Sequence, residues 1–152
     1  MTRRACLVGL GILALGRAGV GVRDLEYRVY AGINAQRRKH GVAPLAWNPA
    51  LASTARAHSW RMLSAGFFAH QDPERGDLIQ RINGAAIPWK SVAENIFREQ
   101  GYDDPVSRAI VEWMYSGAHR LNLLRESFTD TGVGVAVSRD EEYYITQQFL
   151  CH

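Results

Sequence analysis

Apolar positions along the chain recur at two different spacings, which distinguish helices from strands. Between Asp24 and Lys39 they return every fourth position with no internal proline, which predicts an amphipathic helix. Asn48 and Pro49 predict the start of a second helix, because asparagine caps helix N-termini and proline suits the first helical position. Gly66 predicts its end, since glycine accepts the left-handed backbone that closes many helices. One face of this second helix carries Leu51, Ala55, His58 and Met62.

The second half of the chain mixes both spacings. A short helix is expected near Leu78 to Ile82, and Asp104 with Pro105 predicts the start of a longer one. Residues from Ser91 to Phe97 alternate between two faces, which is typical of a strand. The stretch "TGVGVAVSRDEEYYITQQF" predicts a hairpin with a polar turn at Ser138 to Glu141. This order predicts the α+β class, with helices packed on the faces of a small antiparallel sheet.

The N-terminus has the layout of a secretory signal peptide. A basic start, "MTRR", precedes the apolar run "ACLVGLGILALG" and small residues suited to cleavage. The run is shorter than the roughly 20 residues that a membrane-spanning helix needs. We therefore expect a signal peptide at residues 1–19, a single domain at residues 20–152, and a secreted, extracellular or periplasmic protein without a membrane span. A first buried helix stays open as the alternative, although its glycines would weaken it.

Charge and cysteine content narrow the classes of partner. The chain has 18 basic and 15 acidic residues, but Arg3, Arg4 and Arg17 lie in the predicted signal peptide. Without them the domain has 15 basic and 15 acidic residues, so we expect no nucleic-acid partner. The basic cluster from Gln36 to His40 is expected in solvent at the end of the first helix. Cleavage would also remove one of the two cysteines, which leaves the domain without an internal disulfide.

Glu94 is the first residue that packing does not explain. It shares a strand face with Val92 and Ile96, where a carboxylate needs a partner or becomes protonated. His70 and His119 lie in other segments, so the fold can bring them to Glu94. Two histidines and a glutamate can bind a divalent metal with an open position, or act as an acid/base pair. A structural role stays open as well, with Glu94 accepting hydrogen bonds from backbone, arginine or tryptophan donors.

Other polar residues have simpler interpretations. His58 shares its helix face with apolar residues and is expected to be a hydrogen-bonded core histidine. His40 and His152 are expected in solvent, and Asn95 is expected as a buried structural amide. His119 can also cap a helix end. No serine lies in the glycine-flanked turn of a nucleophile elbow, and the sequence has no glycine-rich phosphate loop.

Six stretches together resemble, in order and spacing, the CAP superfamily of cysteine-rich secretory proteins, antigens and pathogenesis-related proteins. They are "INAQRRKHGVAPLAWNPALASTARAHSWRM", "GFFAHQDP", "SVAENIF", "VEWMYSGAHRLNLL", "FTDTGVGVA" and "YYITQQF". The resemblance is closest to the exported bacterial branch and covers Leu25 to Phe149. It implies a three-layer α-β-α sandwich around an antiparallel sheet.

The resemblance also implies a central cleft lined by two histidines and two acidic residues. The first histidine matches His70 in "FAHQDP", the first acid matches Glu94 in "AENI", and the second histidine matches His119 in "GAHR". The second acid has no match, because Met114 to Gly117 stand at its place and Glu112 falls outside it. His70, Glu94 and His119 are therefore the expected ligand-binding residues and the expected ligands of a Zn²⁺ ion.

Members of this family look more often like binding proteins than like enzymes, and zinc, sterol and lipid binding is associated with various members. The resemblance favours a secreted, monomeric binding module with no catalytic residues, whose extracellular ligand is a lipid, a sterol or a protein. Phe67, Phe68, Trp89 and Tyr102 near the cleft loops favour an apolar ligand. Two alternatives stay open: a zinc-dependent hydrolase or peptidase that uses the same cleft, and a purely structural His/Glu set.

Overall fold

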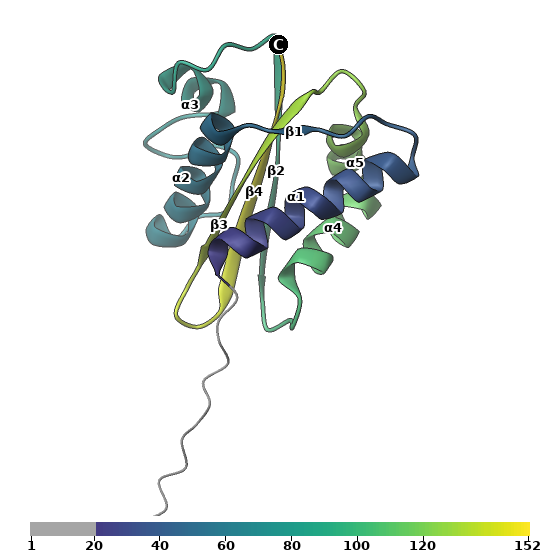
Figure 1. Ribbon diagram of the computed structural model, residues 1–152. Helices are drawn as coiled ribbons and strands as arrows, with labels where there is room; N and C mark the ends of the chain where they lie inside the picture. Colours follow the sequence, from purple (N-terminus) through teal and green to yellow (C-terminus); the bar gives the residue numbers. More distant parts are fainter. Residues whose placement is uncertain (1–20) are drawn as a thin grey trace, which may run out of the picture.

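The structure is a computed structural model that describes residues 21–152 (Figure 1). The predicted signal peptide (residues 1–19) and Cys6 lie outside the described residues. In chain order the elements are α1 (Val22–Lys39), β1 (Ala46–Trp47), α2 (Pro49–Ala65), α3 (Leu78–Gly84), β2 (Ser91–Gln100), α4 (Pro105–Tyr115), α5 (Gly117–Leu124), β3 (Asp130–Val137) and β4 (Glu142–Cys151). Within this range, no helix combines the length and the apolar character needed to cross a membrane.

The strands form one sheet in the order β1-β3-β4-β2. β4 pairs antiparallel with both β3 and β2, whereas the short β1 pairs parallel with β3. Helices α2 and α3 cover one face of this sheet, and α1, α4 and α5 cover the other (Figure 1). The predicted α+β class and three-layer α-β-α sandwich are therefore confirmed.

The helix ends follow the residues that predicted them. The Asn48 side chain accepts hydrogen bonds from two backbone N–H groups at the start of α2, and Gly66 closes this helix with a φ of 71°. Asp77 and Gln80 form a reciprocal capping box at the start of α3. Asp104 caps α4 by accepting from the backbone N–H of Ser107. Local sequence thus fixes where α2, α3 and α4 begin and where α2 ends.

Two glycines of β3 allow α2 to lie directly on the sheet. A Cβ atom at Gly132 would overlap the backbone nitrogen of Ala52, and one at Gly134 would overlap the backbone nitrogen of Arg56. No side chain separates helix from strand at these two positions. The close approach seats α2, with the buried His58, against the face of the sheet that also carries Glu94.

The observed elements differ from the predicted ones at three places. β1 was not predicted, because it pairs over only two residues. β2 continues three residues beyond its predicted end, to Gln100. His119 lies inside α5, a helix that begins at Gly117 and was not predicted.

Arg37 contradicts the prediction that its whole basic cluster lies in solvent. Arg38, Lys39 and His40 are exposed, but the Arg37 side chain is fully buried. Its guanidinium donates to the backbone oxygens of Ala43 (2.7 Å), Leu123 (2.8 Å), Arg125 (3.0 Å) and Phe128 (3.3 Å). The end of α1 is therefore joined to the segment that connects α5 to β3.

Candidate functional site

Glu94 lies on β2 with its side chain turned toward α2 and α3. Arg81 of α3 binds both carboxylate oxygens, at 3.0 Å to Oε1 and 2.9 Å to Oε2. The Gln148 amide, on the neighbouring strand, donates to Oε2 at 2.9 Å, and the His70 Nδ1 atom lies 3.0 Å from Oε1. The carboxylate is thus held by donors from α3, β4 and the loop after α2.

This set of donors decides the charge of Glu94. Burial alone would raise the pKa of the carboxyl, but the hydrogen bonds from His70 and Arg81 and the charge of Arg81 lower it to about 2. Glu94 is therefore ionised at neutral pH although its side chain is only 2% exposed. The sequence-based alternative in which arginine donors satisfy Glu94 corresponds to what the geometry shows.

His70 lies in the loop that follows α2 and is about half exposed, at 54% of its side chain. An ionised carboxylate can only accept, so His70 Nδ1–H donates to Glu94. This hydrogen bond leaves the Nε2 atom available to another partner. Arg81 also donates to the backbone oxygen of His70 at 2.8 Å, which fixes the loop as well as the carboxylate.

His58 approaches Glu94 from α2 but does not act as its partner. Its Nε2 atom is 3.8 Å from Glu94 Oε1 and 2.9 Å from the backbone oxygen of Ala69. Burial lowers the pKa of His58 and outweighs the opposing effect of the Glu94 charge. The ring is therefore neutral at neutral pH and serves as a hydrogen-bonded core residue, as its helix face predicted.

His119 lies on α5, on the opposite side of the sheet edge. Its Nδ1 atom is 2.9 Å from the Ser116 hydroxyl, and burial followed by the nearby charge of His70 lowers its pKa. The buried Asn95 side chain donates to the His119 backbone oxygen at 3.1 Å and accepts from Asn122 at 2.9 Å. Asn95 is thus the structural amide that the sequence predicted, and it ties α5 to β2.

A cleft of about 540 Å³ runs between these two sides, over the first residues of β2. It is lined by His70, Asp77, Leu78, Ile79, Trp89, Lys90, Ser91, Val92, Ala93, Glu94 and Asn122. His119 is not among the lining residues, although its helix contributes Asn122. Of the four aromatic residues expected near the cleft, only Trp89 lines it. Phe67 instead packs near Met62, and Tyr102 lies under the Arg108 guanidinium.

The donor set of the cleft does not match a three-ligand zinc site in this arrangement. Both Glu94 oxygens already accept hydrogen bonds, and a guanidinium bound to them competes with a cation. Within residues 21–152, no three His, Cys, Asp or Glu side chains are grouped so as to hold a metal ion. Zinc binding by His70, Glu94 and His119 stays a prediction, and we derive no step through a metal.

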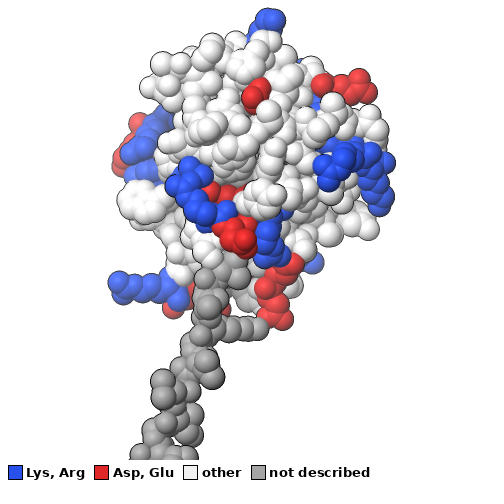
Figure 2. All heavy atoms as spheres, viewed as in Figure 1, with Lys and Arg blue, Asp and Glu red and all other residues white. Residues whose placement is uncertain are grey.

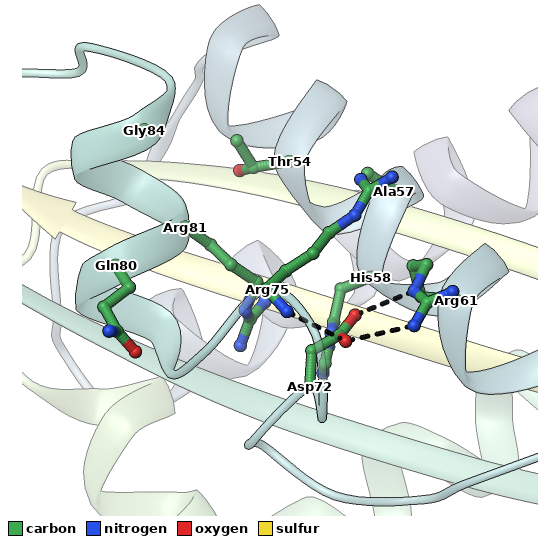
Figure 3. A pocket seen from close by; sticks show the side chains of 9 residues that line it. All are labelled: Thr54, Ala57, His58, Arg61, Asp72, Arg75, Gln80, Arg81 and Gly84. Carbon is green, nitrogen blue, oxygen red and sulfur yellow. Dashed lines mark hydrogen bonds and ion pairs between the residues drawn. The ribbon is translucent and has the colours of Figure 1, made fainter. Parts of the chain in front are cut away.

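A second cavity, of about 280 Å³, lies between α2 and α3 behind the Glu94 network (Figure 3). Arg61 binds the carboxylate of the buried Asp72 there through two hydrogen bonds, at 3.0 and 3.2 Å. Burial alone would raise the pKa of Asp72, but Arg61 and two backbone N–H groups lower it to about 2. Asp72 therefore fixes the loop that carries His70 to helix α2.

Figure 2 shows how charged side chains are distributed on one face of the domain. Acidic and basic side chains lie next to one another near the lower middle of this face, and a group of basic side chains lies at its right edge. The absence of a nucleic-acid partner stays a prediction from net charge.

The family model of the cysteine-rich secretory protein (CAP) family matches residues 30–149. The chain belongs to the CAP family. The uncharacterized protein YkwD of Bacillus subtilis (strain 168) is 36% identical over 129 residues, which cover 85% of this chain and 48% of YkwD. The expected family, and its bacterial branch, are confirmed.

Solved structures of bacterial proteins agree with this assignment. An extracellular protein with an SCP domain from Bacillus anthracis is 32% identical, with a TM-score of 0.74 over 86% of this chain and 41% of that protein. A cysteine-rich secretory protein from Staphylococcus aureus is 25% identical, with a TM-score of 0.67 over 86% of this chain and 39% of that protein. The chain spans less than half the length of each of these relatives, so their CAP domain is the part that corresponds to it.

Sequence reasoning found Glu94 and His70 but missed the residues that hold them. Arg81 was not predicted, although a buried carboxylate implies a cation nearby and "QRIN" offers one on a short helix. Gln148 is the cross-strand neighbour of Glu94, and that register follows only from the assembled sheet. The Arg61–Asp72 pair was also missed, because its members are eleven residues apart on a helix and a loop.

Proposed function

We propose that this CAP domain is an extracellular, monomeric, non-catalytic binding module whose ligand occupies the cleft lined by His70, Glu94 and Asn122, beside the helix that carries His119. The observation that carries the proposal is the hydrogen bonding and ionisation of Glu94. An enzyme that used this cleft would need Glu94 as a general base or as a metal ligand. Its oxygens are bound by Arg81, Gln148 and His70, and its pKa is about 2. So weak a base is poorly matched to proton transfer at neutral pH, because general bases work best with a pKa near the working pH.

The walls of the cleft support ligand binding. Leu78, Ile79, Trp89 and Val92 supply apolar surface, and Ile79 is 45% exposed. Lys90, Asn122 and the free Nε2 atom of His70 supply polar groups at the same opening. A few polar groups in a largely apolar concavity are typical of small-molecule and peptide sites. The extracellular location is supported by the B. anthracis relative, which is an extracellular protein.

Thermal-shift measurements with fatty acids, sterols and capped peptides test the proposal. Ile79→Arg places a charge in the cleft at an exposed position, and Val111→Arg makes the same change on α4, where the side chain is 48% exposed and away from the cleft. We expect at least one ligand to raise the Tm of the wild type and of Val111→Arg, but not of Ile79→Arg. Equal responses of the two variants, or no response from any ligand, would contradict a binding function for the cleft.

The zinc prediction needs its own experiment, a calorimetric titration of residues 20–152 with Zn²⁺. The comparison variant is His70→Ala/His119→Ala, shown to be folded by circular dichroism. One-site binding with proton release in the wild type, lost in the variant, would establish the metal site and make hydrolase assays worthwhile. Absence of binding by the folded wild type would leave the cleft as a site for other ligands.

A further inference from the structure

The strand that floors the cleft is an edge strand. β2 pairs with β4 on one side only, and no strand of the described sheet lies on its other side. Successive residues of an antiparallel strand direct their backbone N–H and C=O groups alternately toward the partner strand and away from it. The carbonyl of Ile96 accepts from the Trp113 indole at 3.0 Å, so the even-numbered residues face away from β4.

Helices cover part of this outward edge and leave one stretch open. Trp113 of α4 covers it at Ile96, and Asn122 of α5 lies 3.5 Å from the carbonyl of Glu94. Toward the start of the strand, Val92 also faces outward. Among residues 21–152, no hydrogen bond reaches the N–H or C=O of Val92, or the N–H of Glu94, from that side. Ser91 to Glu94 therefore form the open part of the edge.

This open stretch is also the floor of the cleft. All of its residues line the cavity of about 540 Å³, with Leu78 and Trp89 on the α3 side and Asn122 on the α5 side. An unpaired strand edge at the base of a groove is the geometry by which proteins add an extended peptide to a sheet. Main-chain hydrogen bonds then provide affinity, and alternate side chains enter pockets on the two walls.

We infer that the cleft binds an extended peptide segment of another protein, which adds to the sheet as a short strand beside Ser91–Glu94. The peptide backbone pairs with the N–H and C=O of Val92 and with the N–H of Glu94. One side chain of the peptide is large and apolar and packs against Leu78 and Trp89, and the next points toward Asn122. This inference rests on the proposed function, because it names the class of ligand for the same cleft.

A peptide matches this floor better than the other candidate ligands. An acyl chain or a sterol would cover the backbone groups of Val92 without bonding to them, and buried polar groups without partners are unfavourable. A second copy of the chain would have to pair its own β2, but α4 and α5 cover that strand beyond Glu94. Four open residues at about 3.4 Å each accommodate a short peptide rather than the edge of another sheet.

The test begins with a library of capped random hexapeptides selected on the folded domain. Each enriched peptide is synthesised with one N-methyl group at each position in turn, and its affinity is measured by calorimetry. We expect at least a tenfold loss at one position, whose N–H donates to the carbonyl of Val92, and less than a threefold change at the other positions, because the open group of Glu94 is a donor. Equal sensitivity at all positions, or no enriched peptide, would overturn strand addition.

A substitution in the protein tests the same backbone pairing by removing a donor of the strand rather than of the peptide. Val92→Pro removes an outward N–H that takes no part in the ladder with β4, and proline is tolerated at such edge positions. We expect at least a tenfold weaker affinity for the selected peptides, with an unchanged circular dichroism spectrum. If Val92→Pro does not fold, the N-methyl series alone decides, because it leaves the protein unchanged.

The outcomes separate this inference from the proposed function. Lipid or sterol binding that Ile79→Arg abolishes, without peptide binding, would keep the binding cleft and overturn the peptide. Peptide binding that Ile79→Arg leaves unchanged would contradict both the proposed function of the cleft and the inference that the peptide binds there. Sedimentation that shows a dimer lost in Val92→Pro would identify a second copy as the occupant and overturn the inference.

Discussion

At the scale of single residues, Arg37 is unusual because it is a buried cation that pairs with no acidic side chain among residues 21–152. Its guanidinium donates to four backbone carbonyls, two of them at the end of α5. Cations at helix C-termini are favoured by the helix dipole, which accounts for a charge at this place. Burial lowers the pKa of Arg37, but arginine keeps its proton throughout the physiological range. One guanidinium group therefore supplies hydrogen bonds to backbone carbonyls of two separate segments, one at Ala43 and one from Leu123 to Phe128.

Replacing Arg37 is therefore expected to destabilise the domain strongly. Arg37→Met leaves several buried carbonyls without donors, and each such group costs about 1–3 kcal/mol. We expect a loss of about 3 kcal/mol in the free energy of unfolding, measured by urea denaturation. Arg38→Met, at the exposed neighbouring position, should change it by less than about 0.5 kcal/mol. Similar losses in both variants would show that the hydrogen bonds of Arg37 contribute little.

The Arg81–Glu94 pair supports a second prediction at this scale. Both side chains are buried, at 7% and 2% exposure, so removing one partner leaves an uncompensated charge. We expect Arg81→Met to cost about 3–5 kcal/mol, and Arg81→Met/Glu94→Gln to recover most of that loss. A double-mutant cycle in urea measures the coupling. Additive effects of the two substitutions would mean that the pair is not coupled.

At the scale of elements, the sequence predicted the ends of helices better than the pairing of strands. Asn48, Asp104 and Gly66 act through local backbone geometry, which their own chemistry sets. Glu94 was recognised because strand alternation placed it on an apolar face. Its partner Arg81 and the two-residue β1 depend on segments far away in the chain, and no local pattern specifies them. The covering of β2 by Trp113 is another such long-range feature.

The seating of α2 on β3 gives a prediction about elements. Gly134→Ala places a Cβ atom against the backbone of Arg56, which cannot move without the whole helix. We expect a loss of about 1–3 kcal/mol or more, as in other overpacked cores. Gly84→Ala, in α3, meets open space and should instead stabilise by about 0.5–1 kcal/mol. Thermal melts should show a lower Tm for Gly134→Ala and a higher Tm for Gly84→Ala. Tm changes in the same direction would contradict the close approach of α2 to β3.

At the scale of the whole molecule, buried carboxylates make stability depend on pH. Asp72 has a pKa of about 2 in the folded protein, against 3.8 for the free side chain. Because the folded pKa is lowered, the stabilisation from Asp72 is present above about pH 4 and is lost as the pH falls toward 2. A difference of nearly two pKa units corresponds to roughly 2 kcal/mol.

Urea denaturation from pH 7 to pH 2 tests this dependence in the wild type and in Asp72→Asn. We expect Asp72→Asn to be less stable by roughly 2 kcal/mol at pH 7. The two curves should approach each other as the pH falls to 2, because the wild-type carboxyl becomes protonated as the pH nears its pKa of about 2. Curves that stay parallel over the whole range would show that Asp72 does not titrate as its environment predicts.

The position of β4 has a consequence for the order in which the domain assembles. β4 lies between β3 and β2, yet it follows both in the chain and is synthesised after them (Figure 1). Until it emerges, β2 has no strand to pair with, and β3 has only the two residues of β1. Sheet formation must therefore follow synthesis of the whole domain, and pairing over such long separations is slow. The growing chain therefore lacks both long strand pairings of the sheet until β4 has been made.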